Sequence, residues 1–178
     1  MKILAVIGES NSGKTWFSRE LKKRYPDHIN IVHSFTSREK REDDKQYGTD
    51  HIFTVKKDIE EVLKENPDQV VAFSVKDDEY YMATDSMFRE NKLNVYTVDL
   101  WGFRQLCNYC MGKHEVYGLY FVPEGTTADL LNIHNMMTED HYVWSHIHAS
   151  VYFSKLKEEE QAYFCELMAS FTGTPDEL

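Results

Sequence analysis

One segment, Gly8-Glu9-Ser10-Asn11-Ser12-Gly13-Lys14-Thr15, constrains this chain more than any other. It matches the pattern G-x-x-x-x-G-K-[ST] and directly follows an apolar run over residues 3–7. The glycines let the backbone turn so that successive N–H groups point into one concavity, and the helix that follows adds the positive end of its dipole. The pattern therefore predicts a phosphate-binding loop, or P-loop, between a first strand and a first helix.

The residue types in this loop indicate a bound triphosphate. Lys14 would reach the β- and γ-phosphates as a point charge, and the Thr15 hydroxyl would be a ligand of the Mg²⁺ that bridges them. The alternative is an ordinary glycine-rich turn, but four fixed positions rarely match by chance in a chain of this length. We expect the nucleotide-binding residues to be Gly8, Asn11, Ser12, Gly13, Lys14, Thr15 and Trp16.

Length, charge and cysteine usage narrow the class of protein. A chain of 178 residues with 42% hydrophobic content predicts one domain with a real core, with room for a small inserted subdomain. A formal charge of −10 disfavours nucleic acid and anionic membranes as main partners. Three cysteines, no apolar run of membrane-spanning length and a start that runs directly into a strand predict a reduced, cytoplasmic protein.

Hydrophobic periodicity predicts alternating strands and helices. The strand over 2–7 is apolar throughout, which is typical of a parallel strand covered on both faces. The fold class is therefore predicted to be α/β, with helices on both faces of a parallel sheet, and the acidic segment that follows Arg41 is expected to be a loop. We expect strands over 2–7, 30–35, 50–55, 69–75, 79–82, 94–99, 115–122 and 150–153, and helices over 13–24, 57–64, 101–111, 127–137 and 155–171.

Three charged residues outside the loop stand out as candidates for ligand binding. Arg38 and Arg41 are spaced one turn apart, and Asp99 lies at the carboxyl end of the strand over 94–99. Ligands of open α/β sheets gather at those strand ends, so Asp99 is a candidate contact for Mg²⁺ or for an acceptor. The alternative for the two arginines is that they are solvated loop charges paired with the acidic residues Glu42, Asp43 and Asp44.

The first hundred or so residues resemble guanylate kinase. The P-loop and the helix end at Tyr25-Pro26-Asp27 are followed by Ser34, Thr36, Arg38 and Arg41 in the family's S-x-[ST]-T-R-x-x-R arrangement. After one inserted residue, Gly48-Thr49-Asp50-His51-Ile52-Phe53 is similar to the family's G-x-D-Y-x-F, Tyr80-Tyr81 to its Y-Y-G, and Val98-Asp99-Leu100-Trp101-Gly102 to its D-x-x-G. The likeness spans roughly residues 2–105.

The resemblance implies a nucleoside monophosphate kinase with a P-loop fold, using ATP and Mg²⁺ as the donor pair. It implies one domain over 1–178, with a core at about 1–35 and 92–178, a small mixed β acceptor-binding subdomain at about 36–91 and a short lid at about 124–148. The expected catalytic residues are Lys14, Arg38 and Arg41, and the expected metal ligands are Thr15 and, as a second candidate, Asp99. The acceptor-binding residues would be Ser34, Arg38, Arg41, His51, Tyr81 and Asp99, with His51 in place of the family's first tyrosine.

Three departures from the family bear on function. The position of the family's guanine-recognising glutamate is Ala72, the glycine after the tyrosine pair is Met82, and the short lid has no arginine, since the last one in the chain is Arg104. We therefore expect a rebuilt base pocket that takes another base, such as a deoxypyrimidine, or a modified nucleotide. Two alternatives stay open: Asp68 or Asp77 restores guanine recognition, or the chain is a guanylate-kinase-like binding module without turnover.

Two groups of possible metal ligands are weaker. Cys107-x-x-Cys110 with His114 has part of a zinc pattern, but it lies in an expected helix without a convincing fourth ligand, so packing thiols are favoured. His146-x-His148, near His134 and His141, could bind a metal, but alternation beside a strand favours one exposed and one packed imidazole.

Overall fold

The structure is a computed structural model, and it describes residues 1–8, 12–121, 147–149, 157–159, 162 and 165–166. Asn11, most of the expected lid at 124–148, the expected helix over 127–137, the expected strand over 150–153 and most of the final helix therefore lie outside the described residues. So do His134, His141 and His146.

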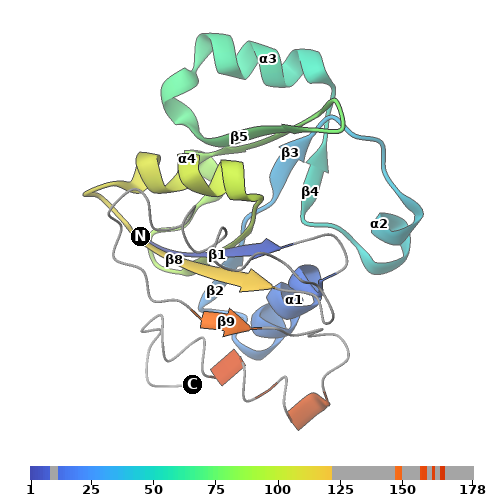
Figure 1. Cartoon of the computed structure of the whole chain (residues 1–178), viewed down its shortest axis with the longest axis vertical. Coiled ribbons are helices and arrows are strands. Elements are labelled where there is room, and N and C mark those ends of the chain that lie inside the picture. Colours follow the sequence, from blue (N-terminus) through green and yellow to red (C-terminus); the bar gives the residue numbers. More distant parts are fainter. Residues whose placement is uncertain (9–11, 122–146, 150–156, 160–161, 163–164, 167–178) are drawn as a thin grey trace.

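A five-stranded parallel sheet forms one half of the described fold (Figure 1). Its order is β2-β7-β1-β8-β9, and every neighbouring pair runs parallel. The first strand along the chain is therefore central, as an apolar run covered on both faces predicts. The five strands are β1 (Lys2–Gly8), β2 (Ile29–Ile31), β7 (Leu93–Thr97), β8 (Glu115–Phe121) and β9 (Ile147–Ala149).

Alternate residues of β1 point into two separate cores. Ile3, Ala5 and Ile7 pack in a cluster with residues of α4 (Leu100–Cys110), whereas Leu4 and Val6 pack with residues of α1 (Lys14–Arg24). The two helices cover opposite faces of the sheet (Figure 1). Each large apolar side chain buried here contributes about 1.5–3 kcal/mol relative to exposure, so β1 is held from both sides. The expected α/β class with helices on both faces is confirmed.

A four-stranded mixed sheet forms the other half, in the order β4-β3-β6-β5. β3 and β4 run parallel, and the other two pairs are antiparallel. A small mixed β unit was expected here, although the borders proposed at residues 36 and 91 stay a prediction. Its strands are β3 (Ser34–Thr36), β4 (His51–Phe53), β5 (Val70–Lys76) and β6 (Glu79–Thr84), accompanied by α3 (Lys56–Glu65) and two short 3₁₀ turns, η1 (Pro67–Gln69) and η2 (Asp85–Met87).

The expected single strand over 30–35 is wrong. The segment forms two strands, β2 in the parallel sheet and β3 in the mixed sheet. The Val32 N–H donates to the Val95 carbonyl at 2.9 Å, and the Ser34 N–H donates to the Asp50 carbonyl at 3.1 Å. The chain therefore changes sheets at His33, and an apolar sequence run carries no signal for the change of hydrogen-bonding partner.

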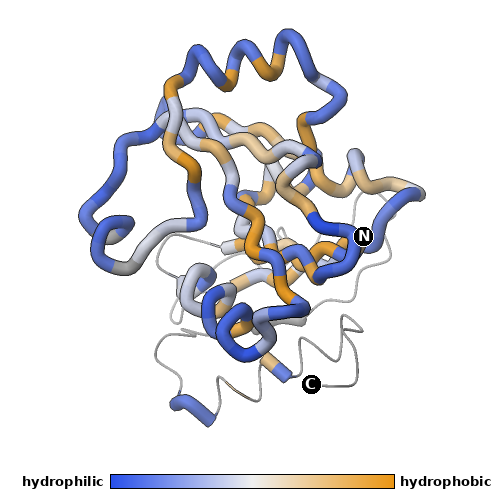
Figure 2. The backbone as a smooth tube through the Cα atoms, turned by 180° about the vertical axis from the view of Figure 1, so that it is seen from behind, coloured by the Kyte–Doolittle hydropathy of each residue, from blue (hydrophilic) through white to orange (hydrophobic). Residues whose placement is uncertain are grey.

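The acidic segment after Arg41 is also different from the expected loop, because it contains the helix α2 (Glu42–Tyr47). The Asp44 carboxylate accepts a hydrogen bond from the Arg41 backbone N–H at 2.8 Å, which caps the first turn. Figure 2 shows this excursion as a largely hydrophilic part of the chain. The remaining expected elements within residues 1–121 lie within about two residues of the observed ones. None of the helices among the described residues is long and apolar enough to cross a membrane.

Gly8 ends β1 at a position that only glycine fits. Its φ is +143°, and a Cβ built there would lie 2.4 Å from the Phe121 carbonyl oxygen of the neighbouring strand β8. The close approach of these two backbones sets where the P-loop leaves the sheet.

Gly8→Ala is therefore expected to destabilise the fold more than Gly112→Ala, which serves as a matched control. Gly112 also has a positive φ, +68°, but a Cβ there would meet nothing within 4 Å. The control should cost about 1–2 kcal/mol from backbone conformation alone, and Gly8→Ala should add about 1–3 kcal/mol from the clash. Urea unfolding of both variants measures the difference, and equal losses would contradict the steric argument.

Candidate functional site

A cavity of about 230 Å³ lies between the two sheets, where the carboxyl ends of β1 and β7 meet residues of the mixed sheet. It joins residues from both halves of the fold and from the P-loop. The lining residues are Gly8, Lys14, Ser34, Arg38, Arg41, His51, Ser74, Lys76, Asp77, Tyr81, Tyr96, Thr97, Val98 and Asp99.

This cavity brings together residues that the sequence analysis assigned to donor and acceptor binding. Gly8 and Lys14 of the P-loop line it, and so do all six expected acceptor-binding residues: Ser34, Arg38, Arg41, His51, Tyr81 and Asp99. Ser12, Gly13, Thr15 and Trp16 do not line it, and Asn11 lies outside the described residues. The roles of these side chains stay predictions.

In the described part of the P-loop, a glycine leads the chain into the first helix. Gly13 has a φ of +97° and is the N-cap of α1, so the loop enters the helix through a conformation that favours glycine. The buried Ser12 hydroxyl accepts a hydrogen bond from the Lys14 ammonium at 3.3 Å. With the glycine at Gly8, these residues fit a triphosphate and its magnesium ion, because N–H groups, an ammonium and a hydroxyl are the donors and ligands that such a group takes.

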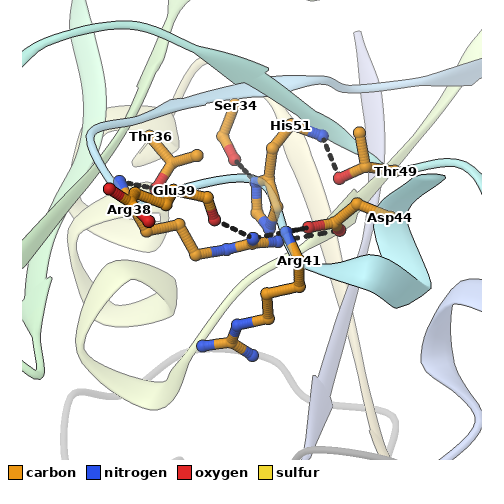
Figure 3. A network of polar contacts seen from close by, with 8 residues as sticks. All are labelled: Ser34, Thr36, Arg38, Glu39, Arg41, Asp44, Thr49 and His51. Atoms are coloured by element: carbon orange, nitrogen blue, oxygen red, sulfur yellow. Dashed lines mark hydrogen bonds and ion pairs between the residues drawn. The ribbon is translucent and has the colours of Figure 1, made fainter.

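Arg38 forms a two-point ion pair with Asp44 at one side of the cavity (Figure 3). Its Nη1 and Nη2 donate to the two carboxylate oxygens at 2.6 and 2.9 Å, and the side chains are only 10% and 11% exposed. Hydrogen bonding from Arg38 holds the pKa of Asp44 well below its usual range. The alternative that Arg38 pairs with an acidic neighbour is therefore observed, but the pair is buried rather than solvated.

Arg41 differs from Arg38 in where its charge lies. Its backbone N–H donates to Asp44, while its guanidinium points away from the Arg38–Asp44 pair (Figure 3). The side chain is exposed and lines the cavity. The cavity is therefore lined by the Arg38 guanidinium, which an ion pair holds in place, and by the Arg41 guanidinium, which lies outside that pair.

His51 is an uncharged polar group at this site. Its Nδ1 lies 2.9 Å from the Ser34 hydroxyl oxygen, and its ring meets the Tyr81 ring edge-on with centroids 5.5 Å apart. Burial, with the nearby charge of Arg38, lowers the pKa of His51 to about 4. The imidazole is therefore neutral at pH 7 and contributes hydrogen bonding rather than positive charge.

Asp99 caps the helix that follows it. Its Oδ1 accepts a hydrogen bond from the Gly102 N–H at 2.7 Å, at the N-terminus of α4. A Cβ on Gly102 would meet Val98 at 2.7 Å, so the turn is tightly packed. One carboxylate oxygen of this expected metal or acceptor ligand is thus used in a structural contact.

Ala72, at the position of the family's guanine-recognising glutamate, is not among the residues that line the cavity. Ala72 is buried in the core rather than lining the cavity, and the β5 residues that line it are Ser74 and Lys76. Ser74 is paired with Tyr81 and lies two residues nearer the end of β5 than Ala72, which is paired with Ala83. A count of residues back from Tyr81 along the sequence does not give this strand pairing, which depends on the register of β5 and β6.

Asp77, one of the residues that could restore base recognition, does line the cavity at the tip of the β5–β6 hairpin. Asp77 and Asp78 have φ values of 54° and 63°, as the two-residue turn of a hairpin requires. The other lining residues that the sequence analysis missed are Ser74, Lys76, Tyr96, Thr97 and Val98. What these residues share, and what could have pointed to them, is their position at the end of β5 or at the carboxyl end of β7.

The cysteines are packing residues, as expected. Cys107 and Cys110 are buried in the core cluster beneath α4, and burial raises the pKa of the Cys110 thiol to about 11. The His114 Nδ1 lies 3.2 Å from the N-terminal amine. Within the described ranges, no group of three or more His, Cys, Asp or Glu side chains could hold a metal ion.

Comparison with solved structures shows the fold. No protein-family model matches the chain, and no curated protein matches it in sequence. A guanylate kinase from Anaplasma phagocytophilum superposes with a TM-score of 0.64 at 14% identity, over 97% of this chain and 87% of that one. A designed protein with a P-loop NTPase fold superposes with a TM-score of 0.52 at 12% identity, over 98% of this chain and 95% of that one. The chain has a P-loop kinase-like fold.

Asp44→Asn should destabilise the fold because it leaves the Arg38 guanidinium buried without its counter-charge. We expect a loss of about 1–3 kcal/mol in the free energy of unfolding. Glu42→Gln is the matched control, since Glu42 pairs with Lys45 at 3.0 Å on the surface and should change stability by about 0.5 kcal/mol or less. Equal effects in urea unfolding would show that the buried pair adds nothing.

His51 should make stability fall as the pH is lowered from 7 to 5. The unfolded histidine takes up a proton near pH 6.5, whereas the folded one resists protonation down to about pH 4. By proton linkage this costs about 2 kcal/mol at pH 5. His51→Gln should lack this loss, so its stability profile should be flatter. The Asp44 contribution is lost only below about pH 4 and does not interfere. Parallel profiles for wild type and variant would contradict the low pKa.

Proposed function

We propose that this protein transfers a phosphoryl group from ATP to a nucleoside monophosphate. The observation that carries the proposal is the shared cavity, in which Lys14 of the P-loop faces the same space as Arg38, Arg41 and Tyr81. Phosphoryl transfer needs the donor and acceptor phosphates held in line, with cations on both sides. The P-loop kinase-like fold supports the proposal, because the same fold occurs in a guanylate kinase.

On the donor side, the N–H groups around Gly8 and Gly13 and the Lys14 ammonium would hold the phosphates of ATP, and the Thr15 hydroxyl would hold magnesium. Magnesium, when bound, neutralises the charge that develops on the β- and γ-phosphates. The protein's own contribution is a preformed set of donors, which costs no reorganisation during transfer. The exposed Trp16 lies in the first turn of α1, directly after this loop.

On the acceptor side, Arg41 is the cation best placed to bind the monophosphate dianion, because its guanidinium lines the cavity and is exposed. The Arg38 guanidinium would face the acceptor phosphate in a fixed orientation, since Asp44 already holds it in place. His51 and Tyr81 would add hydrogen bonds without charge. This combination positions a dianion but leaves the net positive charge small, because Asp44 offsets Arg38.

The base would lie against Ser74, Lys76, Asp77 and Thr97. Ala72 supplies no carboxylate there, so we propose that guanine has no special advantage over other bases. Asp77 keeps the opposite outcome open, because its carboxylate could accept hydrogen bonds from a base with amino and imino donors.

A second candidate function is a nucleotide-binding module without turnover. It is favoured by the Arg38–Asp44 pair, because a guanidinium already occupied by a carboxylate is less available to a phosphate. The intact P-loop residues Gly8, Gly13, Lys14 and Thr15 favour the enzyme.

A screen of ATP consumption tests the proposal. The purified protein is assayed with ATP, Mg²⁺ and each of GMP, dGMP, AMP, CMP, UMP, dCMP and dTMP. We expect turnover with at least one acceptor other than GMP, and a loss of at least about 10³-fold in kcat for Lys14→Ala, since the lysine stabilises phosphate charge rather than the core. Lys64→Ala, an exposed lysine of α3, is the control and should keep full activity.

Three results of the screen would count against parts of the proposal. No turnover with any acceptor would favour the binding module. Turnover that Lys14→Ala leaves intact would remove the P-loop as the donor site. A preference for GMP and dGMP above about 10³-fold would mean that guanine recognition has been restored, because that is the scale of a missing buried hydrogen-bond partner.

A further inference from the structure

Asp50 is a buried carboxyl group that belongs to the segment compared with G-x-D-Y-x-F, but the motif gave it no role and it does not line the cavity. It lies immediately before β4 and is only 8% exposed. Its backbone carbonyl accepts a hydrogen bond from the Ser34 N–H, which fixes the residue between the two sheets. Its side-chain Oδ2 is fully buried and has no hydrogen-bond partner within the described part of the chain. A buried carboxylate oxygen in this state calls for a ligand or a function.

The surroundings of Asp50 point toward the P-loop. The Thr15 hydroxyl lies near the carboxyl group, and the charged or titratable groups that act on this carboxyl group are Arg19 of α1, His33 and Asp44. Arg19 reaches from α1 to within 3.3 Å of the Cβ position of Gly48, so the helix and the segment before β4 lie against each other. Burial raises the pKa of Asp50, and Arg19, His33 and Thr15 oppose that effect. The carboxyl group is therefore directed at the residue expected to ligate magnesium.

A threonine that binds a metal needs a partner for its proton. The hydroxyl oxygen gives a lone pair to the metal, so its hydrogen must point to an acceptor on the other side. Carboxylates that accept from metal ligands orient them and raise their donor strength, and losing such a partner typically weakens metal affinity by about 10–100-fold. Asp99 is less suited to this role, because its Oδ1 caps α4.

We propose that Asp50 positions Thr15 as the magnesium ligand of the P-loop, and that its partnerless oxygen accepts a hydrogen bond from a water molecule of the bound ion. The inference rests on the proposed function, because it requires ATP and magnesium at this loop. Asp50 is followed directly by His51 of the acceptor side, so one short segment contacts both substrates' sites. Asp50 is thus a positioning residue.

Binding of ATP without any acceptor tests this role. Isothermal titration calorimetry measures ATP affinity for wild type and for Asp50→Asn, once with Mg²⁺ and once with EDTA. We expect Mg²⁺ to tighten ATP binding to wild type, and Asp50→Asn to lose about 10–100-fold of that gain while its affinity in EDTA stays unchanged. Asp27→Asn, an exposed carboxylate in the turn after α1, is the matched control and should behave as wild type.

A double-mutant cycle with Thr15→Val shows whether Asp50 acts through Thr15. The loss of the Mg²⁺ effect in the double variant should be no larger than in Thr15→Val alone, because each substitution by itself already disrupts the joint action of Asp50 and Thr15 on the metal. Additive losses would overturn the inference.

Other outcomes separate this inference from its alternatives. Equal weakening in Mg²⁺ and in EDTA, or loss of the folded state in Asp50→Asn, would make Asp50 a structural link between α1 and the mixed sheet and would overturn the metal role. An unchanged Mg²⁺ response in Asp50→Asn would also overturn it. If wild type itself binds ATP without any Mg²⁺ response, the proposed function fails at its donor site, which is a different result from a failure confined to Asp50.

Discussion

Burial of β1 on both faces is the constraint on which the rest of the structure depends. Its alternate side chains pack against α4 on one side and α1 on the other, so the strand cannot move along or out of the sheet without exposing apolar surface. Gly8 ends this strand against the Phe121 carbonyl. The start of the P-loop is therefore fixed by the core, and α1 begins at a defined place above the carboxyl edge of the sheet.

The change of sheets at His33 creates the space opposite the P-loop. β2 belongs to the parallel sheet and β3 to the mixed sheet, so the chain carries Ser34 and the residues after it across to face β1. Arg38 is then held by Asp44 and His51 by Ser34. These contacts are internal to the mixed-sheet half, and they give the cavity polar walls before any ligand is present.

Three carboxylates near the cavity have different surroundings. Asp44 is neutralised by a two-point ion pair, Asp99 caps a helix through one oxygen, and Asp50 is buried with one oxygen unpartnered. A buried carboxylate without a full set of partners is costly, so the three differ in what they can offer to a ligand. Asp50 has the capacity to accept a further hydrogen bond, and it lies near the P-loop threonine. This contrast is the reason for assigning it, rather than Asp99, to the metal.

The sequence by itself determined the parts of this protein that depend on local pattern: the P-loop between strand and helix, the central apolar strand, and the α/β class with its helices. Those follow from spacing and residue type, which short-range geometry enforces. Only the tertiary structure decided that 30–35 is divided between two sheets, that Ser74 rather than Ala72 lines the cavity, and that Arg38 is held by Asp44. Strand partners, register and buried charge pairs depend on residues far apart in the chain, so no local pattern encodes them.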